Sequence, residues 1–525
     1  MDRSTIKFGT AGLREVMGPE PGQMNIETIQ VVTQGLADYI KSFSREEWAG
    51  GVVVCHDSRI NSRLFAEETA KVFAGNGIVA HLTADLRPTP FASFAIRQYK
   101  CIAGVNITAS HNPKEYNGYK VYWSDGAQVV YPHDEEIIKA IRNAKTIKTT
   151  LLDSPLIHTI DKACEEAYLT AIYNLRINSL LDIESGKDLK IIYSPLNGAG
   201  ITMIPRALEM WGFTNVHLVE EQKTPDGTFP TTPYPNPETP EALALGIRDL
   251  REKNGDVLLV SDPDSDRLSA TIIYKGAPRR LSGNELGSIM LNYLIANTKP
   301  PKNWATVTTI VSSPLIKLIT EKAGGTCFEV LTGFKYIGEK IHEWEEAKSY
   351  KFLFGMEESL GFLYGTHARD KDATIAACLS SEITLSLKME GKTLIDALYE
   401  IFKKFGIYRE GQSVLSSPQG LEHLVATLDK IRKSPPKTLA GIPILKIEDY
   451  LNSEETGLPS SNVLAFSLKD GSKYILRPSG TEPKLKIYGH IFSESSAFPS
   501  IEAGITTLDK KIKIRLAQIK EELFP

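Results

Sequence analysis

The sequence has little cysteine, no long hydrophobic run and no excess of charge of either sign. Only five of the 525 residues are cysteine, and no two are spaced as CxxC. A structural zinc site or a disulfide framework is therefore not expected. No uncharged apolar stretch approaches the roughly 18 residues that a membrane helix needs. The first residues include Asp2, Arg3 and Lys7 and are not typical of a signal peptide. We expect a protein of the reducing cytoplasm.

The charges nearly balance, with 60 Lys and Arg against 64 Asp and Glu and a net charge of −4. This balance indicates neither a nucleic-acid partner nor a membrane partner. An anionic ligand would need a locally basic pocket. Hydrophobic residues make up 42% and charged residues 24% of the chain, which excludes disordered and fibrous classes. The length predicts three or four domains.

Strand and helix patterns alternate along most of the chain. After Asn25, a candidate N-cap, apolar residues keep helical spacing over 26–43. Strands are expected at 52–55, 78–82 and 102–107, with helices between them. The same β-α-β-α-β order recurs with strands at 189–193, 216–219 and 257–260, and again at 307–311, 327–331 and 352–354. This order predicts α/β domains built on parallel sheets.

The C-terminal part has a different pattern. A hairpin is expected over 463–476, a further strand over 486–489, and a basic amphipathic helix at the end, which predicts an α+β domain. The candidate domain boundaries are the polar stretches near 184–188, 277–283 and 408–418. The expected architecture is three α/β domains of like topology and one α+β domain, with the bounds 1–184, 185–277, 278–408 and 409–525.

Chemically versatile loops follow the third strand of each repeat. These loops are TASHNP at 108–113, SDPDSDR at 261–267 and GMEESLG at 355–361. Ligands of α/β sheets bind beyond the carboxyl ends of the parallel strands. If the domains face one cleft, the three loops supply a nucleophile, a carboxylate cluster and a polar group that recognises hydroxyls.

The carboxylates Asp262, Asp264 and Asp266 alternate, so in an extended segment they point to the same side. Three neighbouring carboxylates favour a hard divalent cation such as Mg²⁺. An EF-hand is a poor alternative, because Arg267 occupies the glycine position and Ile273 the glutamate position. The remaining alternative, a solvated acidic turn, does not usually follow a buried apolar strand.

Ser110 is followed by His111, which raises the possibility of a hydrolase. Adjacent residues rarely form a Ser–His pair, and the chain has no GxSxG motif. A serine facing a Mg²⁺ site is better suited to carrying a phosphoryl group. The alternative is a serine with a purely structural role in the turn.

The segment RPSGTEPK at 477–484 contains a guanidinium, two hydroxyls and glycine, which suit a phosphate-binding loop. An ordinary hairpin-end loop is the alternative. The segment GTAGLR at 9–14 has similar chemistry, and TGFK at 332–335 adds a cation.

These motifs, in this order, together with RPSGTEPKLKIY at 477–488, resemble the α-D-phosphohexomutase family, which includes phosphoglucomutases and phosphomannomutases. NPKEYNGYKVYW at 112–123 and TGFKYIG at 332–338 are similar to the branch that contains phosphoglucomutase-2 and phosphopentomutase. The resemblance implies four domains around a central cleft. It implies that Ser110 is the phosphoserine and that Mg²⁺ is held by Ser110, Asp262, Asp264 and Asp266.

The resemblance also implies an isomerase that moves phosphate between C1 and C6 of a hexose, most simply glucose, through phospho-Ser110 and a hexose 1,6-bisphosphate. Charge stabilisation would come from Arg14, Lys120 and Arg267. His111, Lys120 or Lys371 would move the hydroxyl proton, and the sequence does not choose among them. Substrate contacts would come from Thr10, Gly333, Lys335, Glu357, Ser359, Arg477, Ser479, Gly480 and Thr481.

Other functions are consistent with parts of the pattern. Phosphomannomutase or phosphopentomutase activity would use the same mechanism. A haloacid-dehalogenase phosphatase would use Asp262 as the nucleophile, but Ser265 and Asp266 stand where that family has Thr or Val. A non-catalytic sugar-phosphate sensor would not need Ser110 or the three carboxylates. The expected partners are phosphorylated sugars, and the sequence does not indicate an oligomeric state.

Overall fold

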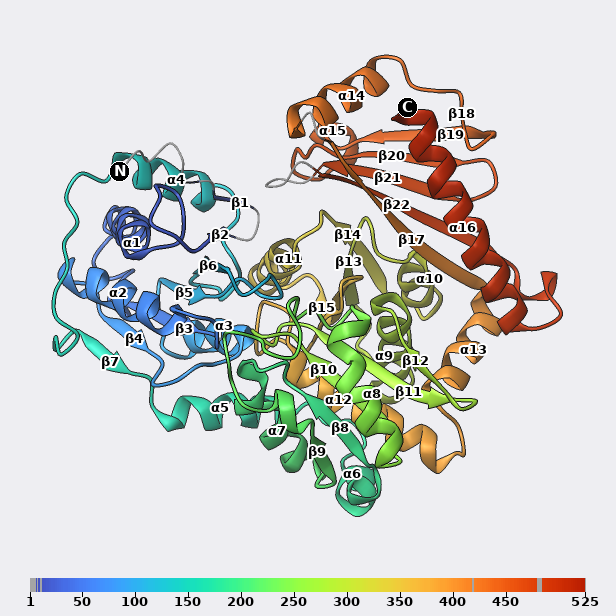
Figure 1. Ribbon diagram of the computed structural model, residues 1–525, viewed down its shortest axis with the longest axis horizontal. Helices are drawn as coiled ribbons and strands as arrows, with labels where there is room; N and C mark the ends of the chain where they lie inside the picture. Colours follow the sequence, from blue (N-terminus) through green and yellow to red (C-terminus); the bar gives the residue numbers. More distant parts are fainter. Residues whose placement is uncertain (1–5, 7, 10–11, 418–419, 479–483, 525) are drawn as a thin grey trace. The chain divides into compact units, whose positions relative to one another are not determined.

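The computed structural model describes residues 6, 8–9, 12–417, 420–478 and 484–524. The chain forms two compact units. The larger unit contains Met1–Val307 and Gly333–Leu394, and the C-terminal unit contains Thr308–Thr332 and Ile395–Pro525. Each unit is described by itself below (Figure 1).

The first sheet of the larger unit has seven strands in the order β1-β2-β6-β5-β3-β4-β7. The strands are β1 (Phe8–Gly9), β2 (Gly12–Val16), β3 (Val52–His56), β4 (Ala80–Leu82), β5 (Ala103–Ile107), β6 (Tyr116–Trp123) and β7 (Ile157–Thr159). β3 pairs in parallel with β4 and β5, as the sequence predicts, while β2 and β6 add an antiparallel side. Every residue of β3 is buried, which explains its continuous apolar run.

Helices cover both faces of this sheet. They are α1 (Ile26–Ile40), α2 (Ser62–Gly75), α3 (Thr89–Gln98), α4 (His133–Asn143) and α5 (Lys162–Tyr173). The side chain of Asn25 caps α1 by accepting a 2.9 Å hydrogen bond from the backbone of Thr28. α1 ends at Ile40, three residues before the last apolar residue of the helical pattern.

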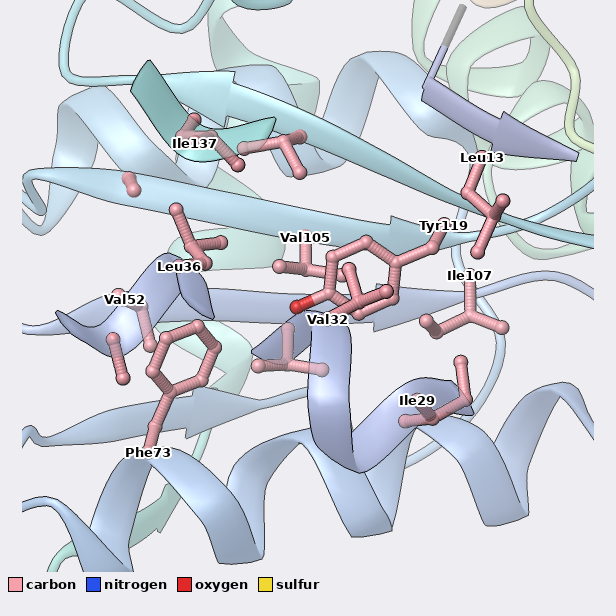
Figure 2. Packing of buried hydrophobic residues seen from close by; sticks show 14 of the residues in the cluster. Leu13, Ile29, Val32, Leu36, Val52, Phe73, Val105, Ile107, Tyr119 and Ile137 are labelled. Atoms are coloured by element: carbon pink, nitrogen blue, oxygen red, sulfur yellow. The ribbon is translucent and has the colours of Figure 1, made fainter. Parts of the chain in front are cut away.

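The core of the first sheet lies under α1, α2 and α4. Figure 2 shows Ile29, Val32 and Leu36 of α1 directed at the strand residues Val105 and Ile107. This spacing of three and four residues places one apolar stripe of the helix on the sheet, which is why the segment folds as a buried helix.

The second sheet has five strands in the order β12-β11-β10-β8-β9. They are β8 (Ile191–Ser194), β9 (Val216–Leu218), β10 (Val257–Ser261), β11 (Leu268–Tyr274) and β12 (Ala277–Arg280). β8 pairs in parallel with β9 and β10, and β11 and β12 are antiparallel. Its helices are α6 (Ser179–Ser185), α7 (Ile204–Trp211) and α8 (Pro240–Glu252).

The third repeat has the expected strand-helix-strand-helix-strand order. Its elements are α9 (Gly283–Thr298), β13 (Trp304–Thr309), α10 (Pro314–Lys322), β14 (Thr326–Val330), α11 (Phe334–Ala347), β15 (Lys351–Glu357), β16 (Gly361–Tyr364) and α12 (Ala373–Met389). The boundary between the two units passes through this repeat. In the larger unit β15 pairs antiparallel with β16, so the expected loop at 355–361 is the end of β15, a short turn and the first residue of β16.

The C-terminal unit contains a six-stranded sheet in the order β17-β22-β21-β20-β19-β18. Its strands are β17 (Ile407–Ser416), β18 (Thr438–Leu439), β19 (Ile442–Asp449), β20 (Leu464–Leu468), β21 (Lys473–Pro478) and β22 (Lys484–Ser493). The accompanying helices are α13 (Leu394–Phe405), α14 (Leu421–Lys433), α15 (Ser453–Thr456) and α16 (Ile501–Leu523). Figure 1 shows α16 lying along the sheet, where it packs on β17 and β22.

The polar stretch near 408–418 is a strand over most of its length. Residues 407–416 form β17 and pair with β22 along all ten positions. The stretch therefore belongs to the C-terminal sheet rather than to a linker. Within the described part of the chain, no helix is both long and apolar enough to span a membrane.

Candidate active site

Ser110 lies on the loop that follows β5, at the carboxyl end of a parallel strand. Its side chain is buried, and its backbone has a left-handed φ of 53°. Thr108 stabilises the turn, because its hydroxyl accepts a 2.8 Å hydrogen bond from the Ser110 amide. The loop is thus a fixed turn that presents one hydroxyl.

The Ser110 hydroxyl contacts residues of two different loops. It donates a 2.9 Å hydrogen bond to Asp262 of the second repeat. Its Oγ also lies 3.1 Å from Nδ1 of His111. The expectation that adjacent Ser and His residues do not meet is therefore wrong here. The left-handed backbone at Ser110 turns the two neighbouring side chains toward the same side.

The three aspartates follow β10 and form one cluster. Asp262, Asp264 and Asp266 are buried, and one oxygen of each lies within 4.8 Å of the others. Asp262 closes the loop by accepting hydrogen bonds of 3.1 and 3.0 Å from the amides of Asp266 and Arg267. The alternation seen in the sequence thus becomes a tight turn with three converging carboxyl groups.

The surroundings shift the pKa values of the three aspartates in different directions. Burial, with Asp264 and Asp266 adding to it, raises the pKa of Asp262 well above its ordinary value. Burial also acts to raise the pKa of Asp266, but Lys371, Lys120 and Arg267 outweigh it and hold that pKa below its ordinary value. The pKa of Asp264 is also below its ordinary value. Burial and Asp266 act to raise this pKa, but Lys120 outweighs them and lowers it.

Two buried lysines compensate the cluster. Lys120 of β6 donates to Asp264 at 2.8 Å and to Asp266 at 3.3 Å. Lys371, which precedes α12, lies 3.1 Å from Asp266 and 3.0 Å from Asp370. Burial would lower the pKa of each ammonium, but the surrounding aspartates raise it above its ordinary value. Both lysines are therefore cationic at neutral pH.

The cluster fits a divalent cation. Among the described residues, Oδ1 of Asp264 and Oδ1 of Asp266 are buried and have no hydrogen-bond partner. Asp262 is the third member of the group whose oxygens could hold a metal ion. Buried carboxylate oxygens without donors are the ligands that a hard cation prefers.

Arg14, Arg267 and His111 surround the same cluster. Arg14 donates to the Asn112 side chain at 3.0 Å. Nε of Arg267 lies 3.8 Å from Asp266 and 4.0 Å from Asp262. Burial, together with these two arginines, lowers the pKa of His111 well below its ordinary value. His111 is therefore neutral at neutral pH.

The loop at 355–361 also reaches this part of the larger unit. Gly361 forms a bridge with Arg267. The carboxylate of Glu357 accepts a 2.8 Å hydrogen bond from the amide of Gly333, and Ser359 is half-buried. Lys335 is buried and lies 3.3 Å from Asp134 of α4.

The predicted phosphate-binding residues are only partly described. Arg477 is half-buried near the end of β21, in the C-terminal unit, opposite Lys486 of β22. Thr10, Ser479, Gly480 and Thr481 lie outside the described residues.

The sequence analysis missed two residues of the site. Thr89 donates a 2.9 Å hydrogen bond to Asp264, and Arg59 donates a 2.6 Å hydrogen bond to the backbone oxygen of Ser110. Arg59 lies three residues beyond the end of β3. The rule that ligands lie beyond strand ends would have found it, had it been applied to the first strand of the repeat as well as to the third.

The chain matches three family profiles in succession. They are phosphoglucomutase/phosphomannomutase alpha/beta/alpha domain I over residues 5–148, domain II over 166–273 and domain III over 282–405. A phosphoglucomutase of Staphylococcus haemolyticus is 37% identical, over 92% of this chain and 90% of its own. A probable phosphomannomutase of Haemophilus influenzae is 35% identical, over 89% and 92%.

Solved structures show the same fold. A phosphoglucomutase from Paramecium, parafusin, aligns with a TM-score of 0.74 at 20% identity, covering 98% of this chain and 95% of that one. A putative phosphomannomutase from Thermus thermophilus aligns with a TM-score of 0.71 at 21% identity, covering 96% and 99%.

Fold and site together define a phosphosugar mutase built from three α/β/α domains and a fourth, sheet-containing C-terminal domain. The chain belongs to the α-D-phosphohexomutase family, that of the phosphoglucomutases and phosphomannomutases. It is a phosphohexomutase, an isomerase.

Proposed function

We propose that this phosphohexomutase interconverts glucose 1-phosphate and glucose 6-phosphate, with Ser110 carrying the phosphoryl group and a hexose 1,6-bisphosphate as primer and intermediate. The observation that carries the proposal is the 2.9 Å hydrogen bond from the buried Ser110 hydroxyl to Asp262 of the carboxylate cluster. The Ser110 hydroxyl is therefore held in one position, close to the groups that would neutralise the charge of a phosphate on it.

In the proposed reaction, the phosphorus–oxygen bond of phospho-Ser110 breaks as a bond forms to a sugar hydroxyl oxygen, and the hydroxyl proton passes to the Ser110 oxygen. The bisphosphate then reorients in the site and returns its other phosphate to Ser110, while a proton passes to the released sugar oxygen. When Ser110 receives that phosphate, its hydroxyl proton must leave. His111 is neutral and lies 3.1 Å away, so its Nδ1 is one acceptor. Asp262 at 2.9 Å is the other.

Charge compensation is the main task of the remaining residues, because phosphoryl transfer depends mostly on positioning and electrostatics. Lys120, Lys371 and Arg267 are cations around the carboxylates, and Arg14 lies within electrostatic reach of Asp264. The lysines stay protonated at neutral pH, which suits them to stabilising anionic phosphate. Of the three candidates for the proton transfer, this leaves His111 as the neutral base.

We propose that the metal is Mg²⁺, held by Asp262, Asp264 and Asp266 together with the phosphate on Ser110. The donor set supports this, since it consists of carboxylate oxygens and two of them lack protein donors among the described residues. When bound, Mg²⁺ would neutralise part of the phosphate charge. The two lysines hold the Oδ2 atoms of Asp264 and Asp266 in place and leave the Oδ1 atoms for the ion.

The proposed sugar contacts come from Glu357 and Ser359, with Gly333 and Lys335 beside them. The amide of Gly333 fixes the Glu357 carboxylate, so one of its oxygens is held and the other is oriented for hydroxyls. The substrate phosphate that is not transferred would bind the loop with Arg477, Ser479, Gly480 and Thr481, and Thr10 would be a further substrate contact. Glucose is favoured because the staphylococcal relatives are phosphoglucomutases, while the Haemophilus relative keeps mannose as the alternative.

The sugar preference is tested by comparing glucose 1-phosphate, mannose 1-phosphate and ribose 1-phosphate, each with its matching bisphosphate. We expect the highest kcat/KM for glucose 1-phosphate. A higher value for either other sugar would contradict the glucose assignment and leave the mechanism intact.

The carrier role is tested with Ser110→Ala. Turnover should vanish, and intact-mass analysis should show a phosphorylated fraction in the wild type that the variant lacks. Ser380→Ala is the matched control, because it also removes a buried serine hydroxyl but lies on α12. Mutase activity close to wild type in Ser110→Ala would refute the carrier assignment.

A further inference from the structure

Arg59 is a buried cation to which the proposed reaction assigns no role. It lies just beyond β3 and is only 3% exposed. Asp57 fixes it from one side: Nε of Arg59 lies 3.4 Å from Asp57 Oδ2, and Asp57 Oδ1 accepts a 2.9 Å hydrogen bond from the Arg59 amide. A third bond, 2.7 Å from the Ser62 hydroxyl, holds the same carboxylate at the start of α2. The guanidinium is thus held rigidly.

The guanidinium binds backbone carbonyls of the serine loop. Nη2 donates to the oxygen of Ser110 at 2.6 Å and also to that of Asn112. Nη1 donates to the oxygens of Pro113 and Tyr116 at 2.9 and 3.1 Å. One side chain therefore fixes the chain path from the phosphate carrier to the start of β6. The fork of donors in arginine suits this arrangement, and a lysine ammonium could not reach all four oxygens.

Arg59 also touches the second repeat, which carries the carboxylates. Its Cζ lies 5.0 Å from the ring centroid of the buried Phe229. Its backbone forms a bridge with Gly227, where an added Cβ would lie 2.3 Å from the amide nitrogen of Ile60. The close approach of the two loops is therefore possible only because residue 227 is glycine.

We propose that Arg59 is a positioning residue, which holds the serine loop so that the Ser110 hydroxyl faces Asp262. The backbone of Ser110 is left-handed, a conformation that non-glycine residues seldom adopt, and it needs external support. The carbonyl bonds supply that support, and the contact with Phe229 ties the loop to the domain that carries Asp262. The inference rests on the proposed role of Ser110 as the phosphate carrier.

The test compares Arg59→Gln and Arg59→Lys with the wild type. Three quantities are measured: kcat and KM with glucose 1-phosphate, the melting temperature, and the rate at which dephosphorylated enzyme gains phosphate from glucose 1,6-bisphosphate, followed by intact mass. Arg432→Lys is the control, because it changes an arginine that is also largely buried and pairs with Asp449 in the C-terminal unit.

In Arg59→Gln, kcat and the rate of phosphate gain should both fall about 100-fold, because small displacements of a reacting group have effects of this size. KM should change by less than about threefold, since Arg59 contacts the loop rather than the sugar. Arg59→Lys should lose roughly tenfold, and Arg432→Lys should keep both rates.

Normal phosphate gain in both folded Arg59 variants would overturn the inference. So would the loss of cooperative unfolding in both variants, because Arg59 would then act in folding alone. These outcomes are distinct from failure of the carrier assignment, which would appear as activity and phosphate gain in Ser110→Ala.

Discussion

Lys371 and Asp266 form a buried ion pair with a distance of 3.1 Å, although they come from different repeats of the chain. Asp266 follows a strand of the second sheet, and Lys371 follows the β15–β16 hairpin. The side chains are 8% and 2% exposed, so water could do little to solvate either charge if its partner were removed. The pair therefore has consequences for both stability and catalysis.

Lys371→Gln should destabilise the protein by about 1–3 kcal/mol, because the buried Asp266 carboxylate loses one of its two lysine partners and keeps only Lys120. It should also lower kcat. Lys388→Gln is the control: Lys388 pairs with Asp256 at 2.7 Å, but the two side chains are 42% and 25% exposed, so its removal should change stability by no more than about 1 kcal/mol. Urea unfolding and steady-state kinetics measure both effects. Equal stability of the two variants would contradict the buried-pair argument.

Asp264→Asn should weaken Mg²⁺ binding and reduce kcat, because it removes one charge from the cluster with little change in volume. Titration of activity against Mg²⁺ measures the shift, and EDTA should abolish wild-type activity. Asp256→Asn is the control, since Asp256 directly precedes β10 whereas Asp264 follows it. If neither EDTA nor Asp264→Asn changed activity, the metal assignment would be wrong.

Arg477→Ala should reduce kcat/KM roughly 10- to 100-fold, because a charge-assisted hydrogen bond contributes about 1.5–3 kcal/mol. The phosphate it is proposed to bind stays in place during the reaction, so most of the loss should appear in KM. Lys473→Ala changes a cation at the other end of the same strand and should have little effect. Unchanged kinetics in a folded Arg477→Ala protein would remove this loop from the site.

The pH dependence of stability should depend on Asp182 of α6. Burial and the neighbouring carboxylate of Glu382 raise the pKa of Asp182 from 3.8 to about 9. The folded protein then binds a proton that the unfolded chain has released, so this contribution to stability is full below about pH 4 and is lost as pH rises toward 9.

Asp182→Asn should therefore be more stable than the wild type at pH 8, by roughly 1–3 kcal/mol, and nearly equal to it at pH 4. Urea unfolding at the two pH values measures the difference. Asp188→Asn, at an exposed position six residues away, should show no such pH dependence. If Asp182→Asn were stabilised at pH 4 as much as at pH 8, proton uptake by Asp182 would not be the cause of the stabilisation.

Local patterns predicted the repeated units and the carboxylate cluster. The apolar spacing of α1, the continuous apolar run of β3 and the alternation of Asp262, Asp264 and Asp266 each depend on neighbours in the sequence. The antiparallel strands β6, β11 and β16 were not predicted, because each begins soon after a functional loop whose polar residues hide the start of the strand.

Contacts between residues far apart in the sequence could not be predicted from local patterns. Arg59 binds backbone oxygens about 50 residues away, and a carbonyl has no side-chain signature. The contact between Ser110 and His111 depends on a left-handed φ at a serine, which composition does not reveal. The pairing of Lys371 with Asp266 was likewise not visible, although Lys371 itself was a candidate.

The charge balance of the carboxylate cluster makes the repeats depend on one another during folding. The second repeat supplies the acidic groups, while the first supplies Lys120 and the third supplies Lys371. A second repeat that folded alone would bury three carboxylates with Arg267 as the one cation of its own loop beside them, which is strongly unfavourable. Its loop can take its final form only when both neighbours have docked. The larger unit should therefore unfold as one cooperative block, and partial opening of any repeat should loosen the same loop.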